Sequence, residues 1–155
     1  MKINLFIILL VFSSNVIYSQ CNGRYETQIF NSVSKTTVNY SDQIQYQDSY
    51  HEMDIYTPDS DTASNRPLII FIHGGSYLGG SKTEIDCIDF CEHFAKKGYV
   101  TASVNYRLSS NQLGFVLSQE EQYLTVWNSV ADVKAAIRYF RKDYFNGNNY
   151  RIDQN

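Results

Sequence analysis

The sequence predicts an α/β fold in which a mainly parallel sheet carries helices on its faces. Two strand-like segments, 67–72 (PLIIFI) and 99–106 (YVTASVNY), enclose a helical segment between them. This order of strand, helix and strand is typical of a right-handed crossover unit in a parallel sheet. Shorter and more polar strands precede the unit and are expected to pair antiparallel, so we predict a mainly parallel sheet with antiparallel N-terminal strands and flanking helices.

The composition bounds the class of protein. The chain has 155 residues, of which 43% are hydrophobic and 15% aromatic, which suits one domain with a real core. Its formal net charge is −3 and no run of like charge is present, so there is no basic surface for nucleic acid. Neither cysteines nor histidines follow the spacing of metal ligands, so we predict no metal site and no cofactor.

Residues 1–19 have the layout of a secretory signal peptide. Lys2 provides a positive charge, the apolar run 5–12 (LFIILLVF) follows it, and Ile17 and Ser19 precede a possible cleavage site at Gln20. A membrane anchor is the alternative, but a spanning helix needs roughly 20 apolar residues. Lipidation of Cys21 is a further alternative, although glutamine is unfavourable before a lipidated cysteine. We therefore expect an exported chain whose domain covers residues 20–155.

Two short strands are expected before the first buried strand. Segments 36–40 and 50–56 alternate polar and apolar residues, and the turns between them favour antiparallel pairing. Pro58 ends the second strand, and 59–65 is a polar loop. Segment 67–72 differs from both, because its consecutive large apolar residues indicate a strand buried on both faces of the sheet.

The first helix is expected to follow the glycine-rich loop 73–80. Ser81 and Thr83 are candidate N-caps, because each has an acidic residue three positions later. Gly98 supplies the left-handed stop after the helix. Four residues at helical spacing form its expected buried face: Cys87, Phe90, Cys91 and Phe94.

The second helix is expected after a loop that runs from Arg107 to about Tyr123. Asn146–Gly147 ends this helix, and another buried strand should begin near Arg151. The apolar stripe that should face the sheet consists of Val126, Val130, Val133, Ile137 and Phe140.

Export would place the three cysteines in an oxidising compartment, where a pair should close. Cys87 and Cys91 lie one helical turn apart, which is poor geometry for a mutual disulfide. We therefore predict that Cys21 bonds to Cys91, with Cys87 as the other candidate partner. The alternative is three reduced cysteines.

The segment 73–80 (HGGSYLGG) carries the chemical information of the chain. Glycines let the backbone turn sharply and approach a ligand closely. Their N–H groups can converge on one point, as a developing oxyanion in acyl transfer requires. In open α/β sheets, such sites lie beyond the carboxyl ends of the strands, where this loop falls.

At this point the residues resemble a known family. Segment 68–80 is similar to the His-Gly-Gly-Gly loop of α/β-hydrolase esterases and lipases, which lies between the third strand and the first helix. Segments 54–58 (DIYTP), 98–108 (with NYRL) and 131–138 (with AD and AA) resemble other parts of carboxylesterase-like members in the correct order. The resemblance implies the N-terminal portion of an α/β-hydrolase fold, truncated before the nucleophile strand.

The same resemblance implies a carboxylic-ester hydrolase that uses a nucleophilic serine. Gly75 and Ser76 would donate the N–H groups of the oxyanion hole, Gly74 would allow the turn, and His73 would brace the loop. Tyr77 would line either the acyl pocket or the flank of the loop. A Gly-x-Ser-x-Gly motif is absent from the sequence, and in the family order all three triad residues would follow Asn155. The chain alone is therefore expected to be inactive.

Other interpretations of these residues are open. Segment 79–83 (GGSKT) is close to a phosphate-binding P-loop, but Ser81 separates the lysine from the glycines. His73 could be a general base, although no carboxylate partner is evident beside it. Asp132 is expected to be a surface or packing residue, and Tyr106 and Arg107 either pack or order the loop near the site.

The function class also has an alternative. A non-catalytic relative of the hydrolase fold would keep the loop and bind a ligand or partner. The substrate itself stays open, because later loops build most of the pocket in this fold. A small-molecule, glycan or lipid ester would each suit the loop.

Overall fold

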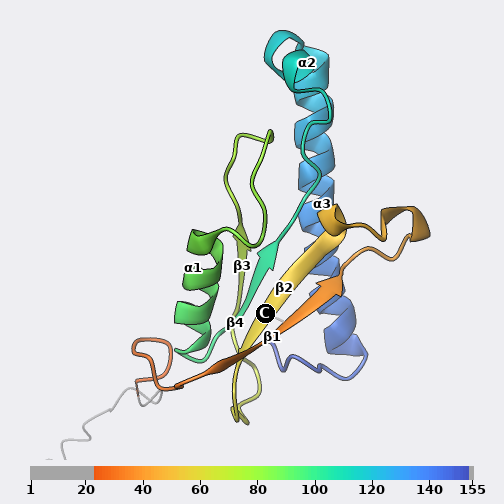
Figure 1. Cartoon of the computed structure of the whole chain (residues 1–155). Helices are drawn as coiled ribbons and strands as arrows, with labels where there is room; N and C mark the ends of the chain where they lie inside the picture. Colours follow the sequence, from red (N-terminus) through yellow and green to blue (C-terminus); the bar gives the residue numbers. More distant parts are fainter. Residues whose placement is uncertain (1–22, 154–155) are drawn as a thin grey trace, which may run out of the picture.

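The computed structural model of the chain describes residues 23–153 and contains a four-stranded mixed sheet with strand order β1-β2-β4-β3 (Figure 1). The predicted α/β architecture, with antiparallel strands first and parallel strands next, is confirmed. β1 pairs antiparallel with β2, β2 antiparallel with β4, and β4 parallel with β3. The strand bounds are β1 Val33–Asn39, β2 Glu52–Pro58, β3 Leu68–Ile72 and β4 Val100–Val104.

The predicted signal peptide (1–19) and Cys21 lie outside the described residues, so export, the division into 1–19 and 20–155, and the pairing of Cys21 stay predictions. Cys87 and Cys91 are buried on α1 (Ile85–Ala95) and are free thiols in the structure. Within residues 23–153, no helix combines the length and apolar character needed to span a bilayer.

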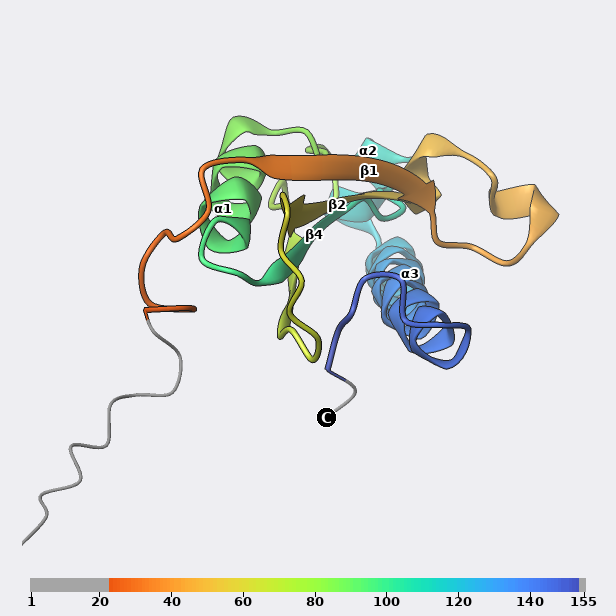
Figure 2. The same cartoon turned by 90° about the horizontal axis from the view of Figure 1, so that it is seen from below.

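The two faces of the sheet hold separate cores, because neighbouring strand residues point to opposite sides. Met53 and Ile55 of β2 pack with Ala102 of β4 against Ala136 and other residues of α3 (Gln119–Phe145). On the other face, Tyr56 of β2 packs with two of the buried residues of α1, Cys91 and Ala95. Figure 2 shows α1 and α3 on either side of the strands.

Segment 67–72 forms β3 as expected, but its predicted burial on both faces is wrong. Leu68 to Phe71 are half-buried and Ile72 is 47% exposed, whereas all five residues of β4 are buried. The reason is position: β3 is the last strand in the sheet order, so its outer edge has no partner strand among the described residues. One parallel bridge, between Arg66 and Ile152, lies at the start of that edge.

The start of α1 differs from the prediction that Ser81 or Thr83 caps it. The helix begins at Ile85, its N-cap is Glu84, and this side chain makes no capping hydrogen bond. The Ser81 hydroxyl instead accepts from the N–H of Thr83, so the two residues form a turn before the helix. The end of α1 is as predicted, because Gly98 adopts a φ of +103° there.

The expected loop 107–123 contains helical structure that the pattern did not reveal. α2 spans Gln112–Leu117 and α3 already begins at Gln119. Asn111 and Ser118 cap these helices, each accepting a backbone N–H three residues later. Two short 3-10 turns, Ile44–Tyr46 and Ser49–His51, also lie in the connection between β1 and β2.

The predicted apolar stripe of α3 does not form its buried face. Val126, Val130 and Ile137 are each between 37% and 43% exposed, and of the stripe only Phe140 is fully buried. The face that packs on the sheet is offset by about one residue and is more polar: Thr125, Ser129, Asp132, Ala136 and Phe140. The apolar stripe thus lies beside the buried face and remains largely open.

Asp132 anchors this polar face to the sheet. Its carboxylate is 3% exposed and accepts from the backbone N–H of Arg107 (3.0 Å), from Nε (2.8 Å) and from a terminal guanidinium nitrogen (2.7 Å). The Nε2 atom of His51, also buried, lies 3.4 Å from the same carboxylate. Asp132 is therefore a packing residue, as expected, whereas His51 lies in a buried polar cluster and not on a strand.

Replacing Asp132 with asparagine should lower the free energy of unfolding by about 3 kcal/mol, because it leaves the Arg107 charge without its buried counter-ion. Asp42→Asn is the matched control, since the Asp42–Lys142 ion pair also ties α3 to the domain but is exposed. The control should cost less than about 1 kcal/mol. Urea unfolding of both variants measures the difference, and equal losses would contradict the assignment.

Candidate active site

The glycine-rich loop leaves the carboxyl end of β3 and turns through an unusual run of backbone conformations. Gly75, Ser76 and Tyr77 have φ values of +114°, +54° and +64°. A Cβ at Gly75 would collide with the carbonyl oxygen of Gly79, so only glycine fits there. Ser76 and Tyr77 occupy the left-handed region at a cost of about 1–2 kcal/mol each. A serine at position 76 is therefore compatible with the turn.

The loop closes on itself through one carbonyl group. The N–H groups of Leu78 and Gly79 donate to the oxygen of Gly75 at 2.9 and 3.2 Å. In contrast, the N–H groups of Gly75 and Ser76 donate to no group within residues 23–153. The two amides that the family resemblance assigns to an oxyanion hole therefore have no hydrogen-bond acceptor in the described part of the chain.

His73 packs inside the loop. The side chain is buried, its Nδ1 donates to the carbonyl of Gly74 at 2.7 Å, and its ring stacks on Tyr106 with centroids 4.4 Å apart. Since Nδ1 is engaged by the main chain, the contacts of His73 are those of a residue that braces the loop. They favour this role over that of a general base.

A cleft of about 490 Å³ opens beside the loop, with α3 as its opposite wall. Its lining is mostly apolar, which suits the acyl or alcohol group of an ester. Tyr77, the predicted substrate-binding residue, lies on this lining. The lining residues are Ile72, His73, Gly74, Ser76, Tyr77, Tyr106, Ser129, Val130, Val133 and Lys134.

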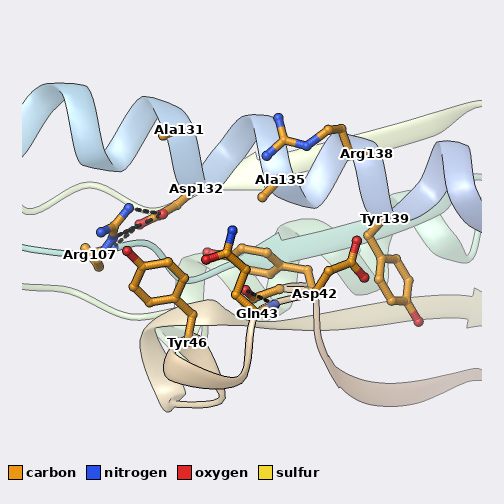
Figure 3. A pocket seen from close by; sticks show the side chains of 11 residues that line it. Asp42, Gln43, Tyr46, Arg107, Ala131, Asp132, Ala135, Arg138 and Tyr139 are labelled. Carbon is orange, nitrogen blue, oxygen red and sulfur yellow. Dashed lines mark hydrogen bonds and ion pairs between the residues drawn. The ribbon is translucent and has the colours of Figure 1, made fainter.

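A second cavity of about 250 Å³ lies between α3 and segment 40–46, away from the glycine loop (Figure 3). In it the guanidinium of Arg107 faces the carboxylate of Asp132, and its charged centre lies 4.9 Å from the ring centre of Tyr46. The charged groups of Arg107 and Asp132 are therefore already paired with each other. We therefore place the candidate active site in the cleft at the glycine loop.

Lys82, which the P-loop interpretation would aim at a phosphate, points into the domain instead. Its Nζ donates to Asp54 at 2.7 Å and lies 3.8 Å from Glu52. Burial acts to raise the pKa of Asp54, but hydrogen bonds from Lys82 and Thr37 and the lysine charges outweigh it, so this pKa is lowered. Lys82 therefore anchors the end of the loop and is not available to a phosphate.

Within the part of the chain that the structure describes, no group of His, Cys, Asp or Glu is arranged to hold a metal ion. Burial raises the pKa of Cys87 and raises that of Cys91 to about 12, so both α1 thiols stay protonated and unreactive.

The comparison with known proteins identifies the family. The profile of the BD-FAE family, an α/β-hydrolase esterase family, matches residues 53–155. The chain belongs to the BD-FAE family. The match begins at the second residue of β2 and includes the glycine loop and all later elements, so it covers every residue that lines the cleft.

A curated relative agrees with the BD-FAE assignment. The chain is 32% identical over 103 residues to the pyrethroid hydrolase Ces2a of Mus musculus, a match that covers 64% of this chain and 17% of the relative. The family of ester hydrolases that the sequence resemblance implied is thereby confirmed.

Solved structures of esterases share the fold. A truncated carbohydrate esterase from gut microbiota aligns with a TM-score of 0.53 and 26% identity, over 84% of this chain and 39% of that one. Butyrate-bound Est2 of Thermogutta terrifontis aligns with a TM-score of 0.53 and 26% identity, over 76% of this chain and 36% of that one. Esterase B of Lactobacillus rhamnosis aligns with a TM-score of 0.54 and 19% identity, over 82% of this chain and 35% of that one. The chain spans less than two-fifths of the length of these relatives.

Replacing Asp54 with asparagine should lower stability by about 3 kcal/mol at pH 7, because Lys82 then stays buried with only the more distant carboxylate of Glu52, at 3.8 Å, as its counter-ion. The lowered pKa of Asp54 fixes the sign of the pH dependence: its contribution is present above the ordinary aspartate value of 3.8 and is lost as pH falls through the folded value. The gap between wild type and variant should therefore shrink below about pH 4.

Urea midpoints measured between pH 2 and pH 8 test this expectation. Asp89→Asn on the exposed side of α1 is the control and should change stability little at any pH. A gap between wild type and Asp54→Asn that persists unchanged at pH 2 would contradict the role assigned to the carboxylate.

Proposed function

We propose that this chain is the N-terminal part of an exported carboxylic-ester hydrolase, in which Gly75 and Ser76 form the oxyanion hole. Two observations carry the proposal: the N–H groups of Gly75 and Ser76 donate to no group within residues 23–153, and the residues on either side of Gly75 line the apolar cleft. Membership of the BD-FAE family, whose relatives are esterases, supports the reaction class.

The chemistry follows from acyl transfer. A serine hydroxyl attacks the acyl carbon, its proton passes to a histidine base, and the carbonyl oxygen becomes an oxyanion that accepts from the two amides. Collapse of this intermediate breaks the ester bond, and the histidine returns the proton to the departing alcohol. Water then hydrolyses the acyl-enzyme by the same steps and releases the acid.

The structure supports a specific place for the serine. Arg66 and Ile152 form a parallel bridge in which the N–H of Arg66 donates to the carbonyl of Arg151 at 2.9 Å. A strand that continued from Ile152 along β3 would end at the same edge of the sheet as the glycine loop. We place the nucleophile beyond Asn155, at the end of that strand, and the other triad residues later still.

The substrate class is a carboxylic ester, from a small molecule, a glycan or a lipid. Relatives of the same fold include a carbohydrate esterase and an esterase with bound butyrate. The apolar lining of the cleft suits the acyl or alcohol part of such an ester, and no cofactor is required for this reaction.

Two glycine substitutions test the proposal in the protein expressed from its full reading frame. Gly75→Ala forces a Cβ against the carbonyl of Gly79 and should lower kcat for p-nitrophenyl acetate about a hundredfold, as the loss of an oxyanion donor does. Gly79→Ala is the matched control, since its Cβ would meet nothing within 4 Å, and it should keep near wild-type activity.

The reading frame past Asn155 gives an independent check: it should encode a buried strand followed by Gly-x-Ser-x-Gly. A frame without this serine, together with an inactive full-length protein that still folds, would overturn the proposal in favour of a non-catalytic binding protein. Equal kcat values for the Gly75 and Gly79 variants would reject the oxyanion role of Gly75.

A further inference from the structure

The segment that follows β4 touches the glycine loop at three separate places. The hydroxyl of Tyr106 donates to the carbonyl of His73 at 2.8 Å, at the start of the loop. The N–H of Ser109 donates to the carbonyl of Tyr77 at 2.8 Å, in the middle of the loop. The side-chain oxygen of Asn105 accepts from the N–H of Lys82 at 2.6 Å, at its end. Gly75 and Ser76 lie between the first two contacts.

Each contact is made by a group that is itself fixed. The side-chain nitrogen of Asn105 donates to Ser49 at 2.7 Å, its own N–H donates to Glu52, and its carbonyl accepts from the hydroxyl of Tyr40 at 2.8 Å. All four hydrogen-bonding groups of Asn105 are therefore engaged, and its acceptor oxygen has little freedom to move.

The start of the loop is held twice by Tyr106. Its hydroxyl fixes the carbonyl of His73 while its ring stacks on the imidazole at an interplanar angle of 15°. The next residue, Arg107, is tied to the buried carboxylate of Asp132, which prevents the segment from lifting away from α3. The chain on both sides of Tyr106 is thus immobilised.

The end of the loop has two further ties besides the bond to Asn105. The hydroxyl of Ser103 donates to the carbonyl of Lys82 at 2.9 Å, and the ammonium group of Lys82 pairs with Asp54. A loop that contains two strained left-handed residues would otherwise relax to other backbone conformations.

We propose that Tyr106 and Asn105 are positioning residues that hold the amides of Gly75 and Ser76 in place for the oxyanion. The inference rests on the proposed function. Both residues act through the loop backbone: the Tyr106 hydroxyl is bonded to His73, and the Asn105 side chain lies outside the lining of the cleft. Displacement of reacting groups by about 1 Å can lower a rate about a hundredfold, so these bonds matter for turnover.

Tyr106→Phe in the full-length enzyme is the sharpest test, because it removes one hydroxyl and keeps the stacked ring. We expect kcat to fall about tenfold or more and KM to change little. The affinity for a boronic acid that forms a tetrahedral adduct with the serine should fall by about the same factor as kcat. Asn105→Ala should give the same pattern from the other end of the loop.

Thr101→Val is the matched control. It also removes a buried hydroxyl, from β4 itself, that donates to the carbonyl of Cys91 in α1 at 2.9 Å and not to the glycine loop. This variant should lose a similar amount of stability and keep the wild-type kcat and boronic acid affinity.

Hydrogen exchange of residues 73–81 in the full-length protein provides a readout that needs no activity. Faster exchange in Tyr106→Phe and Asn105→Ala, but not in Thr101→Val, would support the positioning role. Loss of kcat in all three variants in proportion to stability, or unchanged kcat and exchange in Tyr106→Phe, would overturn it. An inactive wild-type enzyme with the expected exchange differences would instead reject the proposed function alone.

Discussion

The candidate site depends on one constraint, which is that β4 is locked between two neighbouring strands. All five of its residues are buried, and it pairs antiparallel with β2 on one side and parallel with β3 on the other. Its alternate side chains contact both layers: Ala102 lies in the core beneath α3, while Thr101 and Ser103 bond to α1 and to the end of the glycine loop. Asn105 and Tyr106 follow directly after β4, so their backbone is held in place by this strand, and both residues contact the glycine loop.

Polar groups hold the loops around this apolar centre, and most of them are satisfied. The carboxylate of Asp54 accepts hydrogen bonds from Lys82 and Thr37 on one face of the sheet. The carboxylate of Asp132 accepts hydrogen bonds from Arg107 near the other face. Bonds of this kind contribute little net stability when complete, but breaking one is costly because a buried charge is left unpaired. They therefore favour one arrangement of the loops over others. This suits a site in which the position of two backbone amides decides the chemistry.

Local patterns predicted the framework of this fold, and departures occur where tertiary context decides. The apolar run 67–72 and the stop at Gly98 carry their signal within a few residues, and both were placed correctly, although the predicted burial of 67–72 on both faces is wrong. Helix α2 was missed because it has only six residues and contains Gly114, although Asn111 and Ser118 are recognisable caps. Asn105 could not be identified as a site residue, since its role comes from Lys82 and Ser49, which are distant in the sequence. Tyr106 was noted as a residue that either packs or orders the loop, and its hydroxyl bond to His73 is consistent with the second alternative.

The error at α3 has a physical explanation that bears on the site. The apolar stripe is real in the sequence, yet Val130 is 43% exposed and the sheet takes the neighbouring polar face, because Asp132 and Ser129 bind the segment after β4. Ile72, on the edge of β3 that has no partner strand within residues 23–153, is exposed beside the same cleft. Apolar residues on both walls therefore border the position where the proposed nucleophile strand and its following helix would pack. Burying Ile72 and Val130 there would contribute about 0.8 kcal/mol for each methylene-sized group removed from water. The hydrophobic effect would thus favour packing of the proposed strand beside the glycine loop, where Ser76 lines the cleft.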